Sequence, residues 1–168
     1  PLSVHPEGFQ LDPSSNQIFV NLPKARAIVA VDRRSGKQIA SWPMRTGAGN
    51  FPMAINQAAG HVLAAFRTPP MLGVFSIKDG ALIASPDICG DADDVFVDAK
   101  RHRVYVSCGE GFLDVLDSQV SAYKRIARIP TVSGARTSLF VPEFDRLLLA
   151  VRAAPGQPAA IWVFRPIP

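Results

Sequence analysis

The sequence predicts an all-β fold built from repeated four-stranded sheets, and three observations support this prediction. The 15 Pro and 12 Gly of the 168 residues interrupt the chain so often that no stretch keeps a helical apolar period. The segments between them are short and rich in Val, Ile, Leu and Phe, which is typical of strands. These segments also recur at a regular spacing, which is the mark of a repeat architecture.

Four similar apolar segments define the repeat. They are Phe9–Asp12, Met53–Asn56, Val95–Asp98 and Leu139–Pro142, and their last residues are spaced by 44, 42 and 44 positions. A second element follows each of them: Phe19–Asn21, Leu63–Ala65, Tyr105–Ser107 and Leu149–Val151. A third follows in the same order: Val29–Asp32, Gly73–Ser76, Asp114–Asp117 and Trp162–Arg165. A fourth is found three times: Ile39–Trp42, Leu82–Ser85 and Arg125–Arg128.

Four strands in about 40–45 residues match the blade of a β-propeller. A twisted four-stranded sheet cannot bury both faces alone, whereas sheets stacked around an axis can. The first strand of each repeat is nearly all apolar, as expected for the innermost strand. We therefore expect one domain, residues 1–168, with blades at about 5–46, 47–88, 89–132 and 133–168. The last blade lacks its outer strand, because only Pro-Ile-Pro follows Arg165.

How such a chain would close a ring is open from the sequence. Four blades can form a small ring, two chains can complete an eight-bladed ring as a homodimer, or further blades can lie upstream. The chain begins with Pro1 rather than Met. This start is expected if an upstream part was removed or if the chain is a piece of a longer protein.

Composition excludes several function classes. With 48% apolar and 19% charged residues the chain is globular. Its longest apolar runs, such as Ala27–Val31 and Leu147–Val151, are far shorter than a membrane span. The basic run Lys100–Arg103 and the net charge of +4 could suggest nucleic acid. Acids are interspersed, however, and the aromatics occupy core positions, so a solvated turn and no nucleic-acid partner are expected.

Polar residues gather in the loops that lead into the inner strands. The second strand of each blade returns to the same face and brings Asn21, Arg67, Cys108 and Arg152 nearby. Convergent polar groups at a concave mouth indicate a ligand site, although polar loops also occur simply because they meet water. The candidate ligand-binding residues are His5, Glu7, Asn50, Asp91, Asp93, Asp94, Glu110 and Arg136.

Two features of this face have alternative readings. Asp91, Asp93 and Asp94 could offer oxygens to Ca²⁺ or Mg²⁺, but the ligands that complete an EF-hand loop are missing. Turn caps and pairs with arginine are the expected roles, so no metal or other cofactor is predicted. Arg136 could clamp a carboxylate or phosphate, or it could pair with Asp93 or Asp94 of the neighbouring repeat.

Cys89 and Cys108 lie at the same end of one repeat. Pairing the hairpin through Val97 and Val104 puts Cys108 opposite Asp93, so a disulfide requires the preceding loop to fold back. The alternatives are two reduced cysteines or, less favoured, a catalytic thiol. The thiol is disfavoured because His5 is the only histidine expected on that face.

Several stretches of the chain resemble the YncE-like (YVTN-repeat) β-propellers. They are His5–Pro13, Gly90–Phe96, Tyr105–Ser107, Gly109–Phe112 and Gly134–Thr137. Where the family motif has Tyr-Val-Thr-Asn, this chain has Phe19–Asn21 and Tyr105–Ser107. The resemblance implies the C-terminal half of a seven-bladed member. It also implies a periplasmic or secreted protein, because family members are often exported.

The sequence favours a non-catalytic binding or scaffold propeller. No Gly-x-Ser-x-Gly elbow, Walker loop or Rossmann fingerprint is present, so no catalytic residue is predicted. The expected partner is a small molecule, peptide or protein that meets the loops of one face. The alternative is an enzyme of the lactonase or quinoprotein-dehydrogenase-like type. In it His5, Glu7 and Asp93 or Asp94 would act as base or metal ligands, and Arg136 would hold an anionic substrate.

Overall fold

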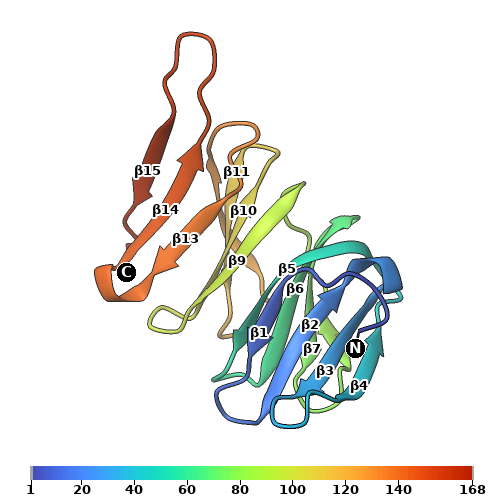
Figure 1. The fold of residues 1–168 in the computed structure, drawn as a ribbon. Coiled ribbons are helices and arrows are strands. Elements are labelled where there is room, and N and C mark those ends of the chain that lie inside the picture. The colour runs from blue at the N-terminus through green and yellow to red at the C-terminus, as the bar shows by residue number, and fades with distance from the viewer. Residues whose placement is uncertain (1, 168) are drawn as a thin grey trace.

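A computed structural model describes residues 2–167 and shows four antiparallel sheets in succession (Figure 1). The first contains β1 (Phe9–Leu11), β2 (Gln17–Leu22), β3 (Ala27–Asp32) and β4 (Gln38–Pro43). The second contains β5 (Ala48–Asn56), β6 (His61–Thr68), β7 (Pro70–Ser76) and β8 (Leu82–Ala84). The third contains β9 (Ala92–Asp98), β10 (Arg103–Cys108), β11 (Phe112–Asp117) and β12 (Arg125–Pro130). The fourth contains β13 (Ser138–Val141), β14 (Arg146–Val151) and β15 (Ala160–Phe164).

Strand order within every sheet follows the chain, and the fourth sheet has three strands. The prediction of four-stranded blades with a last blade lacking its outer strand is therefore confirmed. Two short 3₁₀ turns, η1 (Pro23–Ala25) and η2 (Pro142–Phe144), are the only helices in residues 2–167. No helix of this part is long and apolar enough to cross a bilayer.

The first strands of the first two sheets lie side by side. The Gln10 side chain on β1 donates from Nε2 to the carbonyl oxygen of Met53 on β5 at 3.0 Å. The backbone N–H of Gly8, just before β1, donates to the carbonyl oxygen of Phe51 at 3.2 Å. Contacts between β5 and β9 continue this inner row of strands. The inner strands thus line the axis about which the sheets are arranged.

The main core consists of three layers between successive sheets, and a smaller cluster packs Val20 and Val29 against Leu2 and Val4 on the outer face of the first sheet. Each sheet has one face toward the preceding sheet, which we call its leading face, and one toward the following sheet, its trailing face. On β6, Val62 and Ala64 of the leading face pack with Phe19 of the first sheet. Leu63 and Ala65 of the trailing face pack with the third sheet. The alternation of a strand therefore places apolar residues on both faces, as it must when both are covered.

The four sheets form an open arc rather than a closed ring (Figure 1). The first sheet lies at one end of the arc and the fourth at the other. Apolar side chains on their outer faces are exposed: Phe9 is 61% accessible on β1, and Ile161 is 61% accessible on β15. The sequence left three ways to complete a ring of blades. The open arc excludes one of them in this conformation, the small ring of four blades from a single chain.

Two details of register correct the sequence interpretation. Val97 does pair with Val104, but a bulge between Ser107 and Cys108 places Cys108 opposite Ala92 rather than Asp93. In the fourth sheet Val141 pairs with Arg146 across a turn equivalent to that between Asp98 and Arg103. Val141, not Pro142, is therefore the structural equivalent of Asp98. The repeat comparison made from the sequence placed the last repeat one residue too far toward the C-terminus.

Candidate functional site

One face of the arc carries the loops that lead into the inner strands, and we call it the acidic face. A hollow of about 300 Å³ opens there between the beginnings of β1, β5 and β9. Its lining residues are Glu7–Gln10, Phe51–Met53 and Asp93–Phe96. Of the predicted site residues, Glu7, Asp93 and Asp94 meet in this hollow.

Backbone contacts fix the wall that carries Glu7. The Glu7 N–H donates to the carbonyl oxygen of Asn21 at 3.0 Å, and Gly8 is bonded to Phe51 as described above. A Cβ atom at Gly8 would lie 2.5 Å from the Phe51 carbonyl oxygen, so only glycine allows this approach. The loop before β1 is therefore held against β5, and Glu7 is kept at the rim of the hollow.

Asp94 is a half-buried carboxylate in the opposite wall. Its Oδ2 accepts a hydrogen bond from the backbone N–H of Ser138 on β13 at 2.6 Å. Burial raises the pKa of Asp94 to about 6, and the negative charge of the neighbouring Asp93 adds to the increase. The hollow consequently gains a full negative charge only as the pH rises above about 6.

Two arginines hold the other aspartates in a network between sheets. Arg67 Nη2 lies 2.7 Å from Asp93 Oδ1, and Arg67 Nε lies 3.2 Å from Asp91 Oδ1. Arg136 pairs through Nη1 with Asp91 Oδ2, and its Nε lies 3.5 Å from Asp93 Oδ2. The Arg67 guanidinium also stacks over the Phe51 ring at 4.5 Å. Arg136 thus takes the internal pairing considered from the sequence, with Asp93 and Asp91 and without Asp94.

The remaining predicted residues lie outside the hollow. The His5 side chain is 72% exposed, and its Nε2 is 4.0 Å from Glu7 Oε1. Asn50 is buried and donates to Asn21 Oδ1 at 3.0 Å, while its own Oδ1 has no partner in residues 2–167. Glu110 accepts the Gly90 N–H at 2.6 Å and so orders the loop before β9. Asn50 and Glu110 therefore shape the face without lining its hollow.

Cys89 and Cys108 form a disulfide with their Cα atoms 5.8 Å apart. The loop before β9 does fold back, because the Cys89 N–H donates to Oδ2 of the buried Asp114 at 2.8 Å. Asp114 in turn pairs with Arg128 Nε at 2.8 Å. With both cysteines bonded, a catalytic thiol is excluded. The described residues contain no group of three or more His, Cys, Asp or Glu arranged to hold a metal ion.

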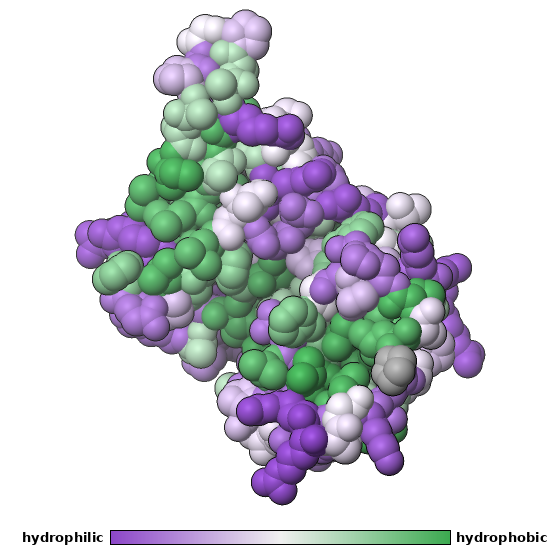
Figure 2. Space-filling model, viewed as in Figure 1, coloured by the Kyte–Doolittle hydropathy of each residue, from purple (hydrophilic) through white to green (hydrophobic). Residues whose placement is uncertain are grey.

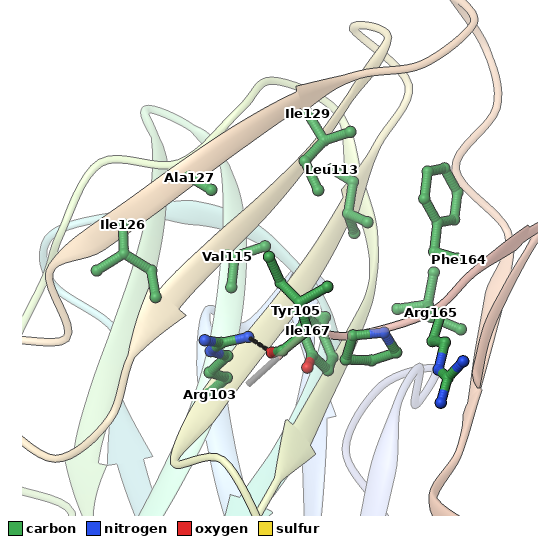
Figure 3. A pocket seen from close by; sticks show the side chains of 12 residues that line it. Arg103, Tyr105, Leu113, Val115, Ile126, Ala127, Ile129, Phe164, Arg165 and Ile167 are labelled. Atoms are coloured by element: carbon green, nitrogen blue, oxygen red, sulfur yellow. Dashed lines mark hydrogen bonds between the residues drawn. The ribbon is translucent and has the colours of Figure 1, made fainter. Parts of the chain in front are cut away.

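A second hollow of about 300 Å³ lies between the third and fourth sheets and is almost entirely apolar (Figure 3). Leu113, Val115, Ile129 and Phe164 line it, and Arg103 Nη1 donates to the Ile167 carbonyl oxygen at 2.6 Å across one side. The outer strands of the third sheet border this hollow because residues 2–167 give the fourth sheet three strands, which leave them uncovered. We attribute the hollow to this uncovered surface rather than to a polar ligand site.

Sequence reasoning did not select two residues that line the hollow, nor the arginine that pairs with Asp93 beside it. Gln10 lies in a segment predicted to be an inner strand, and Phe51 lies in a loop leading into one but carries no polar group, so neither was a candidate. Arg67 was placed on the correct face but was not among the candidates. The one available signal was its position at the far end of a second strand, opposite the acidic run that begins at Asp91.

Comparison with known proteins supports the fold. A scan against protein-family models finds no match, and a search of curated protein sequences finds none either. Among solved structures, hydrazine synthase from Kuenenia stuttgartiensis is similar with a TM-score of 0.83 at 15% identity, over 95% of this chain and 46% of that chain. A chain of the mitotic checkpoint complex is similar with a TM-score of 0.79 at 13% identity, over 99% of this chain and 51% of that one. This chain thus spans about half the length of each, and the fold is that of a partial β-propeller.

Proposed function

We propose that this chain is a non-catalytic binding propeller whose acidic hollow holds a positively charged group of a small molecule or peptide. The observation that carries the proposal is the lining of the hollow. It contains Glu7, Asp93 and Asp94 and no Lys, Arg or His among the described residues. A concave site with convergent carboxylates favours an ammonium or guanidinium group.

The charge balance around the hollow supports this assignment. Asp93 is already paired with Arg67, so its charge is largely compensated. Glu7 and Asp94 have no arginine or lysine partner within salt-bridge distance among the described residues, where Glu7 has only His5 nearby. These two carboxylates therefore keep their charge uncompensated by a basic side chain and can receive a cation, although Asp94 Oδ2 accepts the Ser138 N–H. Asp93 and Arg67 hold the wall between them in place.

The enzyme alternative has weaker support. It requires His5, Glu7 and an aspartate to act as one constellation. His5 is not among the residues that line the hollow, and its side chain is largely exposed beside Glu7. A general base must reach the group from which it takes a proton, and no such pair is formed with Asp93 or Asp94. We therefore favour binding over catalysis.

The proposal also covers the compartment and the partner. An oxidised Cys89–Cys108 bond is typical of proteins in oxidising compartments, in line with a periplasmic or secreted location. A peptide partner would offer its cation on a lysine or arginine side chain. The likeness to a chain of the mitotic checkpoint complex is a likeness of fold, and it is compatible with a protein partner.

Binding can be tested by nuclear magnetic resonance with N-acetyl-arginine amide as probe and N-acetyl-norleucine amide as its neutral control. We expect the arginine probe alone to shift the amide signals of Phe51 and Val95, which line the hollow. Because Asp94 ionises near pH 6, affinity should rise by several-fold between pH 5 and pH 7.

Variants make the test specific. Asp94→Asn should weaken binding and remove most of its pH dependence, and Glu7→Gln should weaken it at both pH values. Glu143→Gln changes an exposed acid in the η2 turn and should leave binding unchanged. Equal shifts with the neutral probe, or full binding by the Asp94→Asn variant, would refute the proposed site.

A further inference from the structure

The two ends of the arc present apolar sheet faces of opposite kinds. The outer face of the fourth sheet is a trailing face, with Leu139 51%, Ile161 61% and Val163 58% accessible. The outer face of the first sheet is a leading face, with Phe9 61% and Leu11 51% accessible. Figure 2 shows green, apolar surface over β13–β15 and again over β1 and β2.

Register confirms that each set lies on one face of its sheet. Leu139 pairs with Leu148, which pairs with Val163, so these three side chains lie in one row across the fourth sheet. Phe140 and Leu147, the neighbours on the opposite side, pack with Tyr105 of the third sheet. The exposed row is therefore the face that points away from the rest of the molecule.

The leading face of the first sheet has the matching row. Phe9 pairs with Val20, which pairs with Val29, and Leu11 pairs with Ile18. Val20 and Val29 are buried in a cluster with Leu2 and Val4, so the open part of this face centres on Phe9 and Leu11 of β1. A shallow apolar hollow of about 200 Å³ lies on this face, lined by Leu2, Ile18, Val20, Val31, Gly36 and Gln38. No charged side chain is among its described lining residues, so the hollow can receive an apolar side chain without burying an unpaired charge.

Three interfaces inside the chain show what such faces pack against. In each, a trailing face covers a leading face: Phe19 and Trp42 meet Met53 and Phe66, for example. Residues 2–167 thus leave one trailing face open and one leading face open in part. Two copies can satisfy both at once, because each supplies the face that the other lacks.

We infer that the occupant of both end faces is a second copy of this chain, joined head to tail. The trailing face of β13–β15 in one copy covers the open part of the leading face of the first sheet, around Phe9 and Leu11, in the other, and the same contact recurs at the second junction. The two arcs then form one ring of eight sheets with two-fold symmetry.

This inference does not depend on the proposed function. It adds one consequence for the acidic face, since the hollow between β1, β5 and β9 would occur twice around a shared axis. A head-to-tail contact that fails to close gives open polymers instead of a ring. Closure therefore predicts one defined species rather than a series.

Light scattering on a size-exclusion column tests the inference with the whole chain. We expect a single species of twice 18.1 kDa that persists on dilution. Ile161→Lys on the trailing face and Phe9→Lys on the leading face should each give monomers, with unchanged circular dichroism because both side chains are exposed. Ile83→Lys changes an exposed apolar residue on β8 of the second sheet, which belongs to neither end of the arc, and should remain dimeric.

Mixing the two monomeric variants distinguishes head-to-tail packing from other dimers. One junction of a mixed pair joins the intact trailing face of the Phe9→Lys chain to the intact leading face of the Ile161→Lys chain. Mixing should therefore restore part of the dimer. A dimer of two trailing faces would be broken by Ile161→Lys and untouched by Phe9→Lys. That result, a wild-type monomer, or a polydisperse series of larger species would each overturn the inference. If Ile161→Lys did not fold, Val163→Lys on the same face would replace it.

Discussion

The acidic face and the opposite face of the arc both carry aspartate and arginine side chains, but these side chains have different roles on the two faces. We call the opposite face, which carries the turns between first and second strands, the hairpin face. There Arg101 Nη1 lies 2.6 Å from Asp145 Oδ1 and 3.0 Å from Asp98 Oδ2, which ties the third sheet to the fourth. Asp12 accepts hydrogen bonds from Ser14 and Ser15 of its own turn.

On the hairpin face these carboxylates accept hydrogen bonds within their own turns or form ion pairs that join neighbouring sheets. On the acidic face Arg67 and Arg136 compensate Asp91 and Asp93, while Glu7 and Asp94 remain at an open hollow. Polar residues in propeller loops therefore do not by themselves indicate a site. What separates the two faces is that Glu7 and Asp94, neither of which has an arginine or lysine partner in residues 2–167, border an open hollow.

The largest expected effect on stability comes from removing the Cys89–Cys108 disulfide of the acidic face. Replacing both Cys89 and Cys108 by alanine removes a cross-link that closes a sequence separation of 19. We expect the free energy of unfolding to fall by about 3 kcal/mol. Urea unfolding with and without a reductant measures it. The reductant should destabilise the wild type and have no effect on the double variant. Equal sensitivity of the two proteins would contradict the prediction.

The next largest effect on stability is expected from replacing Asp98 on the hairpin face. The Asp98 side chain is almost fully buried and accepts hydrogen bonds from Arg101 and, at 2.8 Å, from the Tyr105 hydroxyl. Asp98→Ala leaves both donors without this acceptor, so we expect a loss of about 2 kcal/mol of unfolding free energy. Asp79→Ala, in an exposed turn of the second sheet, is the control and should change stability far less. A loss no greater than that of the control would show that the pairing is not structural.

The smallest effect has the opposite sign and concerns Asp94. Its pKa is raised to about 6 in the folded chain, so folding favours its protonated form. The stability of the wild type should therefore fall as the pH rises from about 4 to about 6. Asp94→Asn keeps an acceptor for the Ser138 N–H and has no charge to bury. We expect it to stabilise the fold at pH 7 on the order of 1 kcal/mol, allowing for solvent screening, and to have little effect at pH 4.

Thermal unfolding at the two pH values measures this difference. Asp117→Asn, a partly exposed aspartate whose side chain bonds within its own turn, is the matched control. A stabilisation of the Asp94→Asn variant that is the same at pH 4 and pH 7 would mean that burial of the charge is not its cause.

Repetition explains why much of the fold can be predicted from the sequence. Apolar segments such as Phe19–Asn21 and Tyr105–Ser107 recur at one spacing, so strand order and the missing outer strand follow directly. The bulge at Cys108 could not be predicted, because it depends on how the loop before β9 is bonded to Asp114. The shift of the last repeat at Val141 has a similar origin, since η2 occupies the turn that the alignment treats as part of a strand.

The candidate site could be predicted only in part. Topology brings Glu7, Asp93 and Asp94 to one face, and alternation along a strand is enough to place them there. Which carboxylates stay unpaired depends on the reach of Arg67 and Arg136 across sheet boundaries. Sequence spacing within one repeat carries no information on such contacts. For the same reason Asn50 was selected as a ligand-binding residue, although it is buried and bonded to Asn21.

The uneven burial of the four sheets has a consequence for how the molecule opens. The residues of β6 from Val62 to Phe66 are fully buried between two neighbours, whereas β15 forms an edge with Ile161 and Val163 open to solvent. Local opening costs least where few apolar contacts are lost. In a single, unpaired copy the fourth sheet can therefore detach as a unit while the second sheet stays intact. Opening of such a copy should begin at the C-terminal end of the arc and progress inward.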